Sequence, residues 1–441
     1  MAVNATTVWE FQSGGADTNG GGFDAGIAGG VDYSTSTTAQ ATLTTASVVG
    51  ATTTDIMVFA TDYTVATTDV GNVMYLTGGS ATTGFYQIQS VVTGAGQYWR
   101  MDRAVGTAGQ TCPGKMGGCR KLVSSNSFPA ALVAGNKVYV KNGSYTIAAY
   151  TGQTAGTTAA PIICEGYNST RGDLPTGSSR PTLAVGSSAF TIGTFTIFRN
   201  IIFTTSNASG ISIGADSRLE YSKATSTNAT STNGAILAGA NRAFVYVCEA
   251  INASGRGIIL SGSGSFAYGS TAHGCDTGIV HSAASSTTLN CISYSNTTAA
   301  FLINASTGGR VINNTFYGAE TPAGIGISGT AGNGFFLNNI IYGFVTGISF
   351  DANYPLNFFN YNNLFNNTTA RSNATAGTND IALDPQFVAA GTGNFAVGTN
   401  MKAAGFPGTF GADISTTIGY TDIGAVQRQE SSSGGGFFGG E

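Results

Sequence analysis

A short unit that recurs at a nearly constant spacing constrains the fold more than any other feature of this sequence. The unit is a small residue, an apolar residue, any residue and a second apolar residue, and it starts at positions 210, 234, 257, 278, 300, 324 and 347. Subtracting successive starts gives steps of 24, 23, 21, 22, 24 and 23 residues. Such a step is too variable for a coiled coil and too short for a propeller blade, whereas a solenoid with loops of variable length produces it.

A second series of apolar segments lies about halfway between these units and usually begins with asparagine. Its members are Arg199-Asn200-Ile201-Ile202-Phe203, Asn290-Cys291-Ile292-Ser293-Tyr294, Asn313-Asn314-Thr315-Phe316-Tyr317, Asn338-Asn339-Ile340-Ile341-Tyr342 and Asn362-Asn363-Leu364-Phe365. The two series together predict two short strands per repeat, stacked as the coils of a parallel β-helix. Because asparagine tolerates the left-handed backbone conformation and its amide can bond to an amide one coil away, we expect a structural asparagine ladder at this turn. We expect the glycines to mark the coil corners before the other strand.

The composition agrees with a large β protein. Charged residues make up 9% of the 441 residues, against about 25% in an ordinary domain, while 42% of the residues are hydrophobic and 64 are glycine. This apolar fraction suffices for a core, and the sequence holds no apolar run of about 18 residues that could span a bilayer. The net charge is −4, and the 18 Lys and Arg residues are scattered singly. We therefore expect neither a nucleic-acid partner nor membrane insertion.

The six cysteines are few for a chain of this length. Buried or free thiols are the favoured interpretation, and a local disulfide between Cys112 and Cys119 or a metal site is the alternative. A zinc site needs four convergent ligands, and the two histidines, His273 and His281, lie far along the chain from this pair. We expect no metal and no cofactor. The cysteines are Cys112, Cys119, Cys164, Cys248, Cys275 and Cys291.

The segments that flank the repeats resemble a known family. A short helix is predicted from near Pro129 to Gly135, and a strand follows at Val138-Tyr139-Val140. This run resembles the entry to the right-handed β-helix of pectate-lyase-like proteins, as does Trp9-Glu10-Phe11. Leu383-Asp384-Pro385-Gln386-Phe387 and Asp422-Ile423-Gly424-Ala425-Val426 are similar to the C-terminal segment of many β-helix repeat proteins. The resemblance covers residues 128 to 427 and implies a right-handed parallel β-helix.

Residues 20 to 125 do not share the 23-residue step. Their alternating and apolar runs, broken by Gly and Thr clusters, predict a separate small β domain. Its pattern resembles N-terminal modules of β-helix proteins of tailed phages. We therefore predict an all-β protein with four parts: an N-terminal β module for attachment or capping at residues 1–125, a right-handed parallel β-helix at 126–370, a C-terminal closing segment at 371–430 and a Gly/Ser tail at 431–441.

Few residues of the coils are candidates for catalysis. A glycosidase uses two carboxyl groups about 5 to 10 Å apart, which on this fold means acids at matching positions of adjacent coils. Adding one coil of 21 to 25 residues to any acid between residues 184 and 370 does not lead to another acid. Glu249 and Asp276 stay as weak catalytic candidates that loops would have to bring together. A calcium-dependent lyase would need a cluster of acids, which the coils do not offer.

Two further motifs have a simple structural interpretation. His273 and His281 flank a coil turn near Asp276, and we expect turn or surface histidines there rather than a catalytic base. The tripeptide Arg171-Gly172-Asp173 has the form of a cell-adhesion motif, and we interpret it as a chance occurrence.

The phage resemblance implies a virion structural protein, either a capsid decoration or a tail appendage such as a spike or fibre. It further implies a homotrimer that binds other virion proteins and adheres to host-surface polysaccharide. The N-terminus has neither a basic nor an apolar segment of a secretory signal, so we expect assembly in the host cytoplasm and a final location in the virion. The alternative is a tailspike-like glycosidase or lyase that degrades host-surface polysaccharide.

Overall fold

A computed structural model describes most of the chain as two compact units, Met1–Thr225 and Ser226–Glu441. The described residues are 3–49, 54–79, 81–121, 131–147, 149–151, 153–207, 209–228, 230, 232–304, 307–318, 324–330, 332–407 and 421–427. Among them, no helix is long and apolar enough to cross a membrane. Short 3₁₀ turns occur at η1 (Thr67–Asp69), η2 (Gly177–Ser179), η3 (Ala390–Thr392) and η4 (Thr399–Met401).

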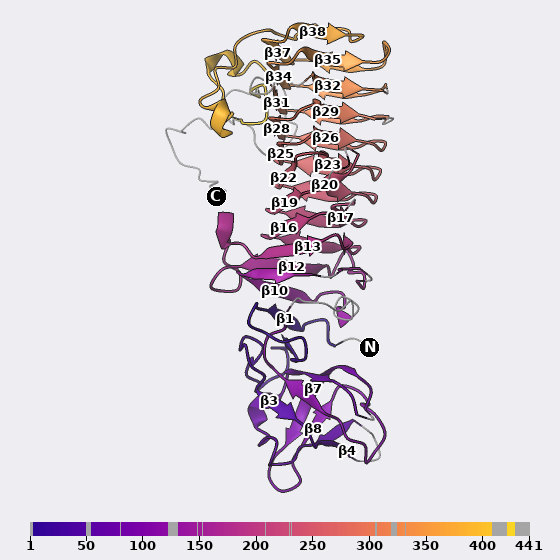
Figure 1. Ribbon diagram of the computed structural model, residues 1–441, viewed down its shortest axis with the longest axis vertical. Coiled ribbons are helices and arrows are strands. Elements are labelled where there is room, and N and C mark those ends of the chain that lie inside the picture. Colours follow the sequence, from indigo (N-terminus) through magenta and orange to yellow (C-terminus); the bar gives the residue numbers. More distant parts are fainter. Residues whose placement is uncertain are drawn as a thin grey trace. The chain divides into compact units, whose positions relative to one another are not determined.

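The second unit shows the β-helix most clearly, because its parallel strands lie one above another from β20 to β38 (Figure 1). Each coil contributes one strand to each of three parallel ladders. The first ladder contains β21 (Phe244–Tyr246), β24 (Phe266–Tyr268), β27 (Thr287–Leu289), β30 (Arg310–Ile312), β33 (Phe335–Leu337) and β36 (Phe358–Asn360). The second contains β22 (Glu249–Asn252), β25 (Thr271–His273), β28 (Ile292–Tyr294), β31 (Thr315–Tyr317), β34 (Ile340–Tyr342) and β37 (Asn363–Phe365). The third contains β20 (Gly234–Ala238), β23 (Arg256–Leu260), β26 (Thr277–His281), β29 (Ala299–Ile303), β32 (Ile325–Gly329), β35 (Thr346–Phe350) and β38 (Thr369–Ser372).

The first unit also contains stacked coils of a parallel β-helix. Its first ladder starts with β1 (Val8–Phe11), which pairs in parallel with β10 (Lys137–Lys141). The other strands of this β-helix are β11 (Ser144–Thr146), β12 (Ile162–Tyr167), β13 (Thr182–Gly186), β14 (Phe190–Ile192), β15 (Thr196–Arg199), β16 (Ile202–Thr205), β17 (Ile211–Ile213), β18 (Arg218–Glu220) and β19 (Lys223–Ser226), whose last residue belongs to the second unit. The predicted fold class, an all-β protein with a right-handed parallel β-helix and a small N-terminal β domain, is confirmed.

The small β domain is an insertion rather than a leading module. The chain leaves the β-helix at β2 (Gly22–Phe23) and returns at Arg120, whose backbone N–H donates to the carbonyl of Glu10 at 2.9 Å. Both segments cover the outer edge of β1, which would otherwise be an open sheet edge. The predicted module of residues 1–125 therefore contains the first strand of the β-helix. Sequence spacing could not reveal this pairing, because β1 and β10 are separated by the whole insertion.

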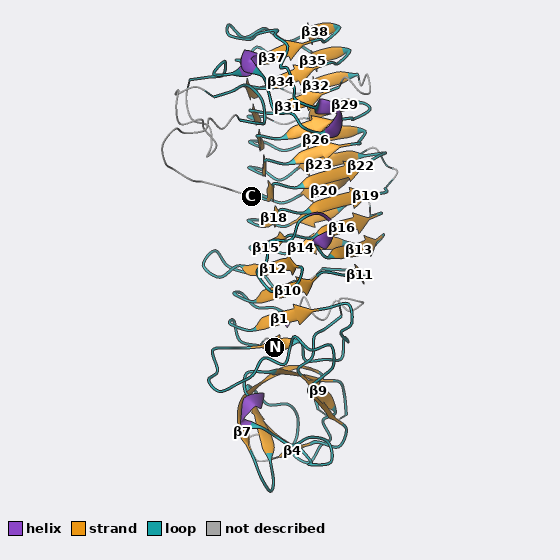
Figure 2. Cartoon of the chain, turned by 90° about the vertical axis from the view of Figure 1, so that its left-hand side faces the viewer, coloured by secondary structure: helices purple, strands orange, loops and turns teal. Residues whose placement is uncertain are grey.

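The insertion forms a seven-stranded antiparallel sheet around its own core, and Trp99 is fully buried there. Figure 2 shows its strands, linked by long loops. The alternating and apolar runs of this region include Val73-Met74-Tyr75-Leu76 and Tyr98-Trp99-Arg100-Met101, which form strands β6 and β8. The seven strands are β3 (Ala41–Leu43), β4 (Ser47–Val49), β5 (Asp55–Met57), β6 (Val73–Leu76), β7 (Gly84–Val92), β8 (Tyr98–Met101) and β9 (Gly114–Met116).

The expectation of two strands per coil is wrong, because each coil of the second unit has three. The glycine-led units form the third ladder and the asparagine-led segments form the second. The strands of the first ladder, such as Phe244–Tyr246, are only three residues long. They follow no fixed Gly or Asn, so the sequence pattern offered no signal for them.

The asparagine ladder is confirmed in the second unit. The amide of Asn314 donates to Oδ1 of Asn339 at 3.0 Å, and the amide of Asn339 donates to Oδ1 of Asn362 at 2.9 Å. Each acceptor also receives the backbone N–H of the asparagine one coil before it. The preceding residues, Asn313 and Asn338, have φ of 53° and 56°. The first asparagine of each pair therefore adopts the left-handed backbone conformation at the corner. The second accepts a buried backbone N–H group of the preceding coil.

Most glycines of these units serve a purpose other than the predicted corners, and only Gly210 among them has a left-handed backbone, with φ of 57°. A Cβ on Gly278 would lie 1.9 Å from Oγ of Ser293, and one on Gly347 would lie 2.7 Å from the carbonyl oxygen of Ala370. Glycine is needed at these two positions because residues of strands β28 and β38 lie too close for a side chain.

The C-terminal closing segment packs on the outer face of the second unit. Both family-like motifs contribute to one apolar cluster, in which Ile423 and Phe387 contact Met401 and Ile340. The start of the helix predicted from near Pro129 to Gly135 lies outside the described residues. Of its described residues, Ala131 is helical and the four from Leu132 to Gly135 are not. The predicted tail lies wholly outside the described residues.

We expect Asn339→Ala to lower the free energy of unfolding by about 1 to 3 kcal/mol, because it leaves the buried N–H of Asn314 without its acceptor. The matched control is Asn379→Ala, whose side chain is exposed and should change stability by less than about 0.5 kcal/mol. Urea unfolding followed by circular dichroism measures both. Equal losses in the two variants would show that the ladder has no special role.

Candidate functional site

Glu249 is brought to a histidine rather than to a second acid. Glu249 starts β22 and stands in register with Thr271, while His273 ends β25 on the same outer face. Nε2 of His273 lies 2.9 Å from Oε1 of Glu249. The imidazole also stacks on Tyr294 of the next coil, with the ring centroids 4.8 Å apart and the planes at 10°. The carboxylate therefore fixes the orientation of an imidazole whose side chain is 23% exposed.

The other predicted candidate, Asp276, lies in the turn between β25 and β26 and is engaged elsewhere. Its carboxylate accepts the hydroxyl of Thr298 and, at 3.4 Å, that of Thr297. The register places Asp276 five positions beyond Thr271, which is the partner of Glu249. The structure thus assigns the two weak candidates to different contacts.

His281 is a core residue and not the expected turn or surface histidine. Its ring is fully buried inside the β-helix, where Nε2 lies 2.6 Å from Oγ1 of Thr288. The ring also meets the edge of Phe301 at a centroid distance of 4.8 Å. Burial lowers the pKa of His281 to about 3, because the apolar core disfavours the charged imidazolium.

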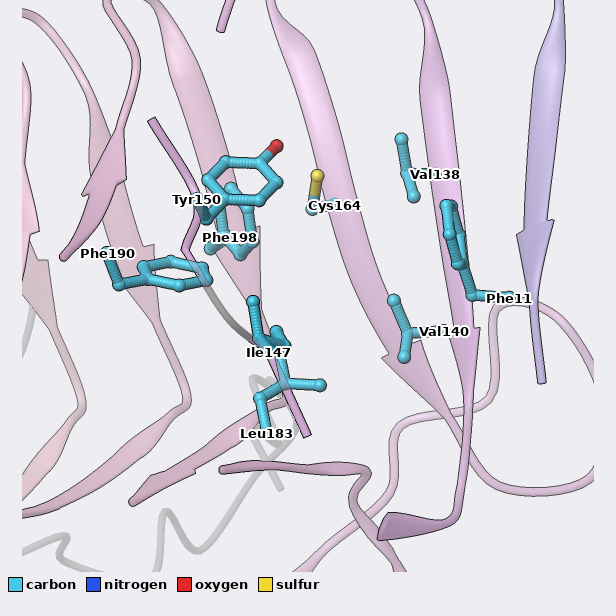
Figure 3. A pocket seen from close by; sticks show the side chains of 9 residues that line it. All are labelled: Phe11, Val138, Val140, Ile147, Tyr150, Cys164, Leu183, Phe190 and Phe198. Atoms are coloured by element: carbon cyan, nitrogen blue, oxygen red, sulfur yellow. The ribbon is translucent and has the colours of Figure 1, made fainter. Parts of the chain in front are cut away.

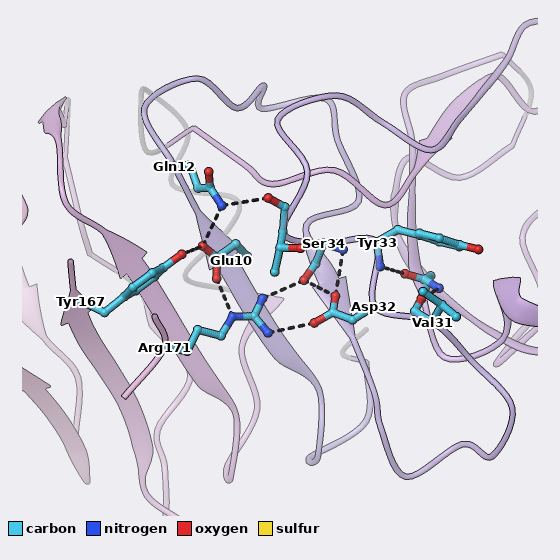
Figure 4. A network of polar contacts seen from close by, with 10 residues as sticks. Glu10, Gln12, Val31, Asp32, Tyr33, Ser34, Tyr167 and Arg171 are labelled. Carbon is cyan, nitrogen blue, oxygen red and sulfur yellow. Dashed lines mark hydrogen bonds and ion pairs between the residues drawn. The ribbon is translucent and has the colours of Figure 1, made fainter. Parts of the chain in front are cut away.

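The described residues also contain a polar network in the first unit that the sequence did not single out. Glu10 on β1 is fully buried and accepts the hydroxyl of Tyr167 and, at 2.7 Å, Nε of Arg171 (Figure 4). Nη1 and Nη2 of Arg171 donate to Asp32 at 2.8 Å and to Ser34 at 2.9 Å. Burial raises the pKa of Glu10, and the charge of Arg171 opposes that rise. One guanidinium thus joins the β-helix to a loop of the inserted domain.

This network supports the interpretation of the Arg171-Gly172-Asp173 motif as chance. The guanidinium of Arg171 is used within the fold, and Asp173 accepts the backbone N–H groups of Asn168, Ser169 and Thr170 at 2.8, 2.8 and 3.1 Å. Asp173 therefore stabilises its own loop, and Arg171 joins the β-helix to the inserted domain.

A further acid, Glu165, lies outside residues 184 to 370, the range searched for stacked acids, and its partner is a cation. Glu165 stands in register with Arg199, 34 residues further on, and its Oε2 accepts Nη2 of Arg199 at 2.6 Å. Long loops at the start of the β-helix account for this step. Locating the pair required the strand register, which the 23-residue repeat does not supply.

All six cysteines are buried and free, so the Cys112–Cys119 disulfide does not form. Burial raises the pKa of Cys112 to about 12 and that of Cys119 to about 11. These thiols are therefore poor nucleophiles and metal ligands. No group of three or more His, Cys, Asp or Glu side chains among the described residues is arranged to hold a metal ion.

A small cavity inside the first unit is apolar. Its volume is about 10 Å³, and it lies between the first turns of the β-helix (Figure 3). A space of this size without polar partners stays dry and holds no ligand. The lining residues are Phe11, Val138, Val140, Ile147, Tyr150, Cys164, Leu183, Phe190 and Phe198.

Aromatic side chains point outward from the first ladder in the same two coils that carry Glu249 and His273. Phe244 and Tyr246 on β21 stand in register with Phe266 and Tyr268 on β24, while the alternate residues of both strands are buried. The rings of Tyr246 and Tyr268 stack with their centroids 5.2 Å apart and their planes at 6°, and Tyr246 is 36% exposed. We call this surface the two-coil face and define it by Phe244, Tyr246, Glu249, Phe266, Tyr268, Thr271 and His273.

One of these outer columns continues into later coils as buried positions. The positions that follow Tyr268 in register are Leu289, Ile312 and Leu337, which are 7%, 6% and 0% exposed and pack with Phe406. Phe266 and Tyr268 also pack against this cluster, whereas the column of Phe244 and Phe266 ends at the exposed Phe358.

Comparisons with known proteins find similarity in fold alone. No family model matches the chain, and no curated protein matches it by sequence. The crystal structure of pectate lyase Pel9A is 16% identical over 68% of this chain and 90% of its own, with a TM-score of 0.43. An arginine-to-alanine variant of the PL6 family alginate lyase AlyGC is 13% identical over 58% of this chain and 40% of its own, with a TM-score of 0.40. A variant of the periplasmic alginate epimerase AlgG is 11% identical over 57% and 77%, with a TM-score of 0.30.

We expect His281 to make the protein sensitive to acid. Its folded pKa of about 3 lies below the unfolded value of about 6.5, so the unfolded chain takes up the proton first and stability falls as the pH drops from 6.5 towards 3. His281→Gln should flatten this part of the curve when urea midpoints are measured from pH 8 to pH 4. An unchanged difference in midpoint between variant and native protein at every pH would contradict the prediction.

We expect Arg171→Met to destabilise the first unit by about 3 kcal/mol, because it leaves the buried Glu10 carboxylate without its cation. The control is Arg218→Met, whose side chain is 53% exposed and 3.7 Å from Glu220, with an expected loss below about 1 kcal/mol. Thermal unfolding of both variants tests this, and similar melting temperatures would refute the special role of Arg171.

Proposed function

We propose that this protein is a structural component of a bacteriophage particle, a β-helical capsid decoration or tail appendage that adheres to host-surface glycan. The observation that carries the proposal is the two-coil face, a set of outward aromatic rings beside the Glu249–His273 pair. Sugar-binding surfaces combine apolar rings with a few oriented hydrogen-bonding groups, and this face has both.

The β-helix supports such a role through its stiffness. Backbone pairing between coils and the ladder from Asn314 to Asn362 leave few ways for one coil to move against the next. A stiff rod that presents a fixed set of side chains suits an appendage that holds a binding surface away from a particle. The resemblance of the inserted domain to modules of tailed-phage β-helix proteins supports the virion location, and homotrimeric assembly belongs to the same proposal.

The binding part of the proposal is tested with purified full-length protein and a panel of bacterial surface polysaccharides. We expect retarded migration in gels that contain a bound polysaccharide and no release of reducing ends. The virion part is tested by mass spectrometry and antibody labelling of purified particles. Label on capsid lattice points indicates a decoration, label at the tail vertex indicates a spike or fibre, and absence from particles contradicts the virion role.

A polysaccharide-degrading enzyme is the second candidate, and the 2.9 Å contact between Glu249 and His273 favours it. A carboxylate that orients an imidazole is an arrangement used for general-base catalysis. Under this hypothesis, incubation with polysaccharide releases reducing ends or unsaturated sugars, and Glu249→Gln reduces the rate about 100-fold or more. Asp276→Asn serves as the comparison, since the structure engages Asp276 with threonine hydroxyls. If both Glu249→Gln and Asp276→Asn still release sugar products at the native rate, other residues catalyse the cleavage.

A further inference from the structure

Val247 is a branched residue at a corner that favours asparagine or glycine. It lies between β21 and β22 and has φ of 49°, in the left-handed region. Among the described residues, it is the one β-branched side chain at a positive φ. A β-branched residue is strained in this conformation, whereas glycine and asparagine adopt it at little cost. The next coils of the second unit have Gly269, Asn290, Asn313 and Asn338 at the equivalent corner, all of them left-handed.

Tyrosines, which are not branched at Cβ, occupy two further corners of this kind. Tyr361 ends the series in the second unit, and its ring packs edge-on against Phe406 with the centroids 5.5 Å apart. In the first unit, Tyr221 has φ of 48°, and its carbonyl oxygen accepts Nη1 of Arg180 at 2.7 Å. Val247 is 39% exposed, so part of its apolar side chain stays in contact with water although the backbone is strained.

The exposed side chain of Val247 borders the two-coil face, between Tyr246 and Glu249 in the chain. Its backbone N–H donates to the carbonyl of Tyr268 in the next coil at 2.8 Å, which holds the corner in place. The corner residue of that coil is Gly269, and a Cβ there would lie 3.3 Å from Cγ2 of Val247. Glycine at this position therefore leaves room for the isopropyl group. We call Tyr246, Val247 and Gly269 the apolar corner.

We infer that the apolar corner binds a methyl group carried by a sugar of the bound glycan; this inference rests on the proposed function. Strained backbone conformations concentrate at ligand-binding sites, where the side chain they present serves the ligand. A methyl group against the isopropyl group of Val247 removes apolar surface from water on both sides. A sugar hydroxyl at the same place would lose its water without gaining a hydrogen-bond partner. The methyl group can belong to a 6-deoxyhexose or to an N-acetyl group.

The test uses the full-length protein and pairs of free sugars in which one member carries the methyl group. Calorimetric titration compares L-fucose with L-galactose, L-rhamnose with L-mannose, and N-acetyl-D-glucosamine with D-glucose. We expect the methyl-bearing member of at least one pair to bind about fourfold more tightly or better, the effect of burying about one CH₂ group. Saturation-transfer NMR should show its methyl protons closest to the protein. The first two pairs report a deoxy sugar, and the third reports an N-acetyl group.

Two substitutions of Val247 separate the contact from the strain. Val247→Thr keeps the branching at Cβ but replaces a methyl group with a hydroxyl, so it should shift the melting temperature by less than about 1 °C and abolish the preference for the methyl-bearing sugar. Val247→Asn fits the left-handed corner, so it should raise the melting temperature by about 2 °C and also abolish the preference.

Val345→Thr is the matched control. Val345 is 48% exposed and lies between β34 and β35, in a coil outside the two-coil face. This variant should keep both the melting temperature and the sugar preference of the native protein. Circular dichroism confirms that each variant is folded.

The possible outcomes separate this inference from the proposed function. Native protein that binds both members of every pair equally, or that binds a surface polysaccharide but none of these sugars, overturns the methyl-group inference and leaves glycan adhesion standing. A preference that survives in Val247→Thr and Val247→Asn, or that is lost in Val345→Thr, overturns the location. A melting temperature that does not rise in Val247→Asn contradicts the strain from which the inference starts. Folded protein that binds no sugar and no polysaccharide overturns both proposals.

Discussion

Pairing of each coil with the next in fixed register is the constraint on which the rest of this structure depends. Parallel strands satisfy one another's backbone groups only when consecutive coils stay aligned, and the turns between them must still satisfy their own N–H groups. The side chains of Asn314, Asn339 and Asn362 do this from inside, since each accepts an N–H from the coil before. A slip of one residue would break this ladder and turn the apolar columns outward.

Register also decides which distant residues can act together. Residues about one coil apart in sequence become neighbours about 4.8 Å apart on one face, so functional side chains on a β-helix occur as columns. Glu249 and His273 meet in this way although they are not themselves a register pair, because His273 stands one alternate position beyond Thr271. Tyr246 and Tyr268 meet by direct register. The arrangement of the two-coil face follows from this geometry.

Much of the fold could be predicted because every coil must stack on the next, so the same sequence pattern recurs in each repeat. The step near 23 residues, the asparagine corners and the apolar alternation all follow from coil stacking, and they led to the β-helix and the ladder. The first ladder of the second unit was missed, since its strands have no distinctive corner residue. The site was predicted less well: Glu249 was found as an isolated acid, but its partner is His273, a side chain expected at a turn or surface without a chemical role.

The sequence by itself therefore determined the class of architecture, because repeated spacing and alternation depend on local backbone geometry alone. It also established that acids are rare in the coils. Only the tertiary structure decided that β1 pairs with β10 across the insertion, that His281 is buried while His273 faces outward, and that Arg171 joins Glu10 to Asp32. These contacts depend on loop lengths and on the path of the chain between segments that are distant in sequence. The packing of Phe406 on Leu289, Ile312 and Leu337 depends on the same path. Local sequence patterns do not specify such long-range contacts, so they could be found only in the folded chain.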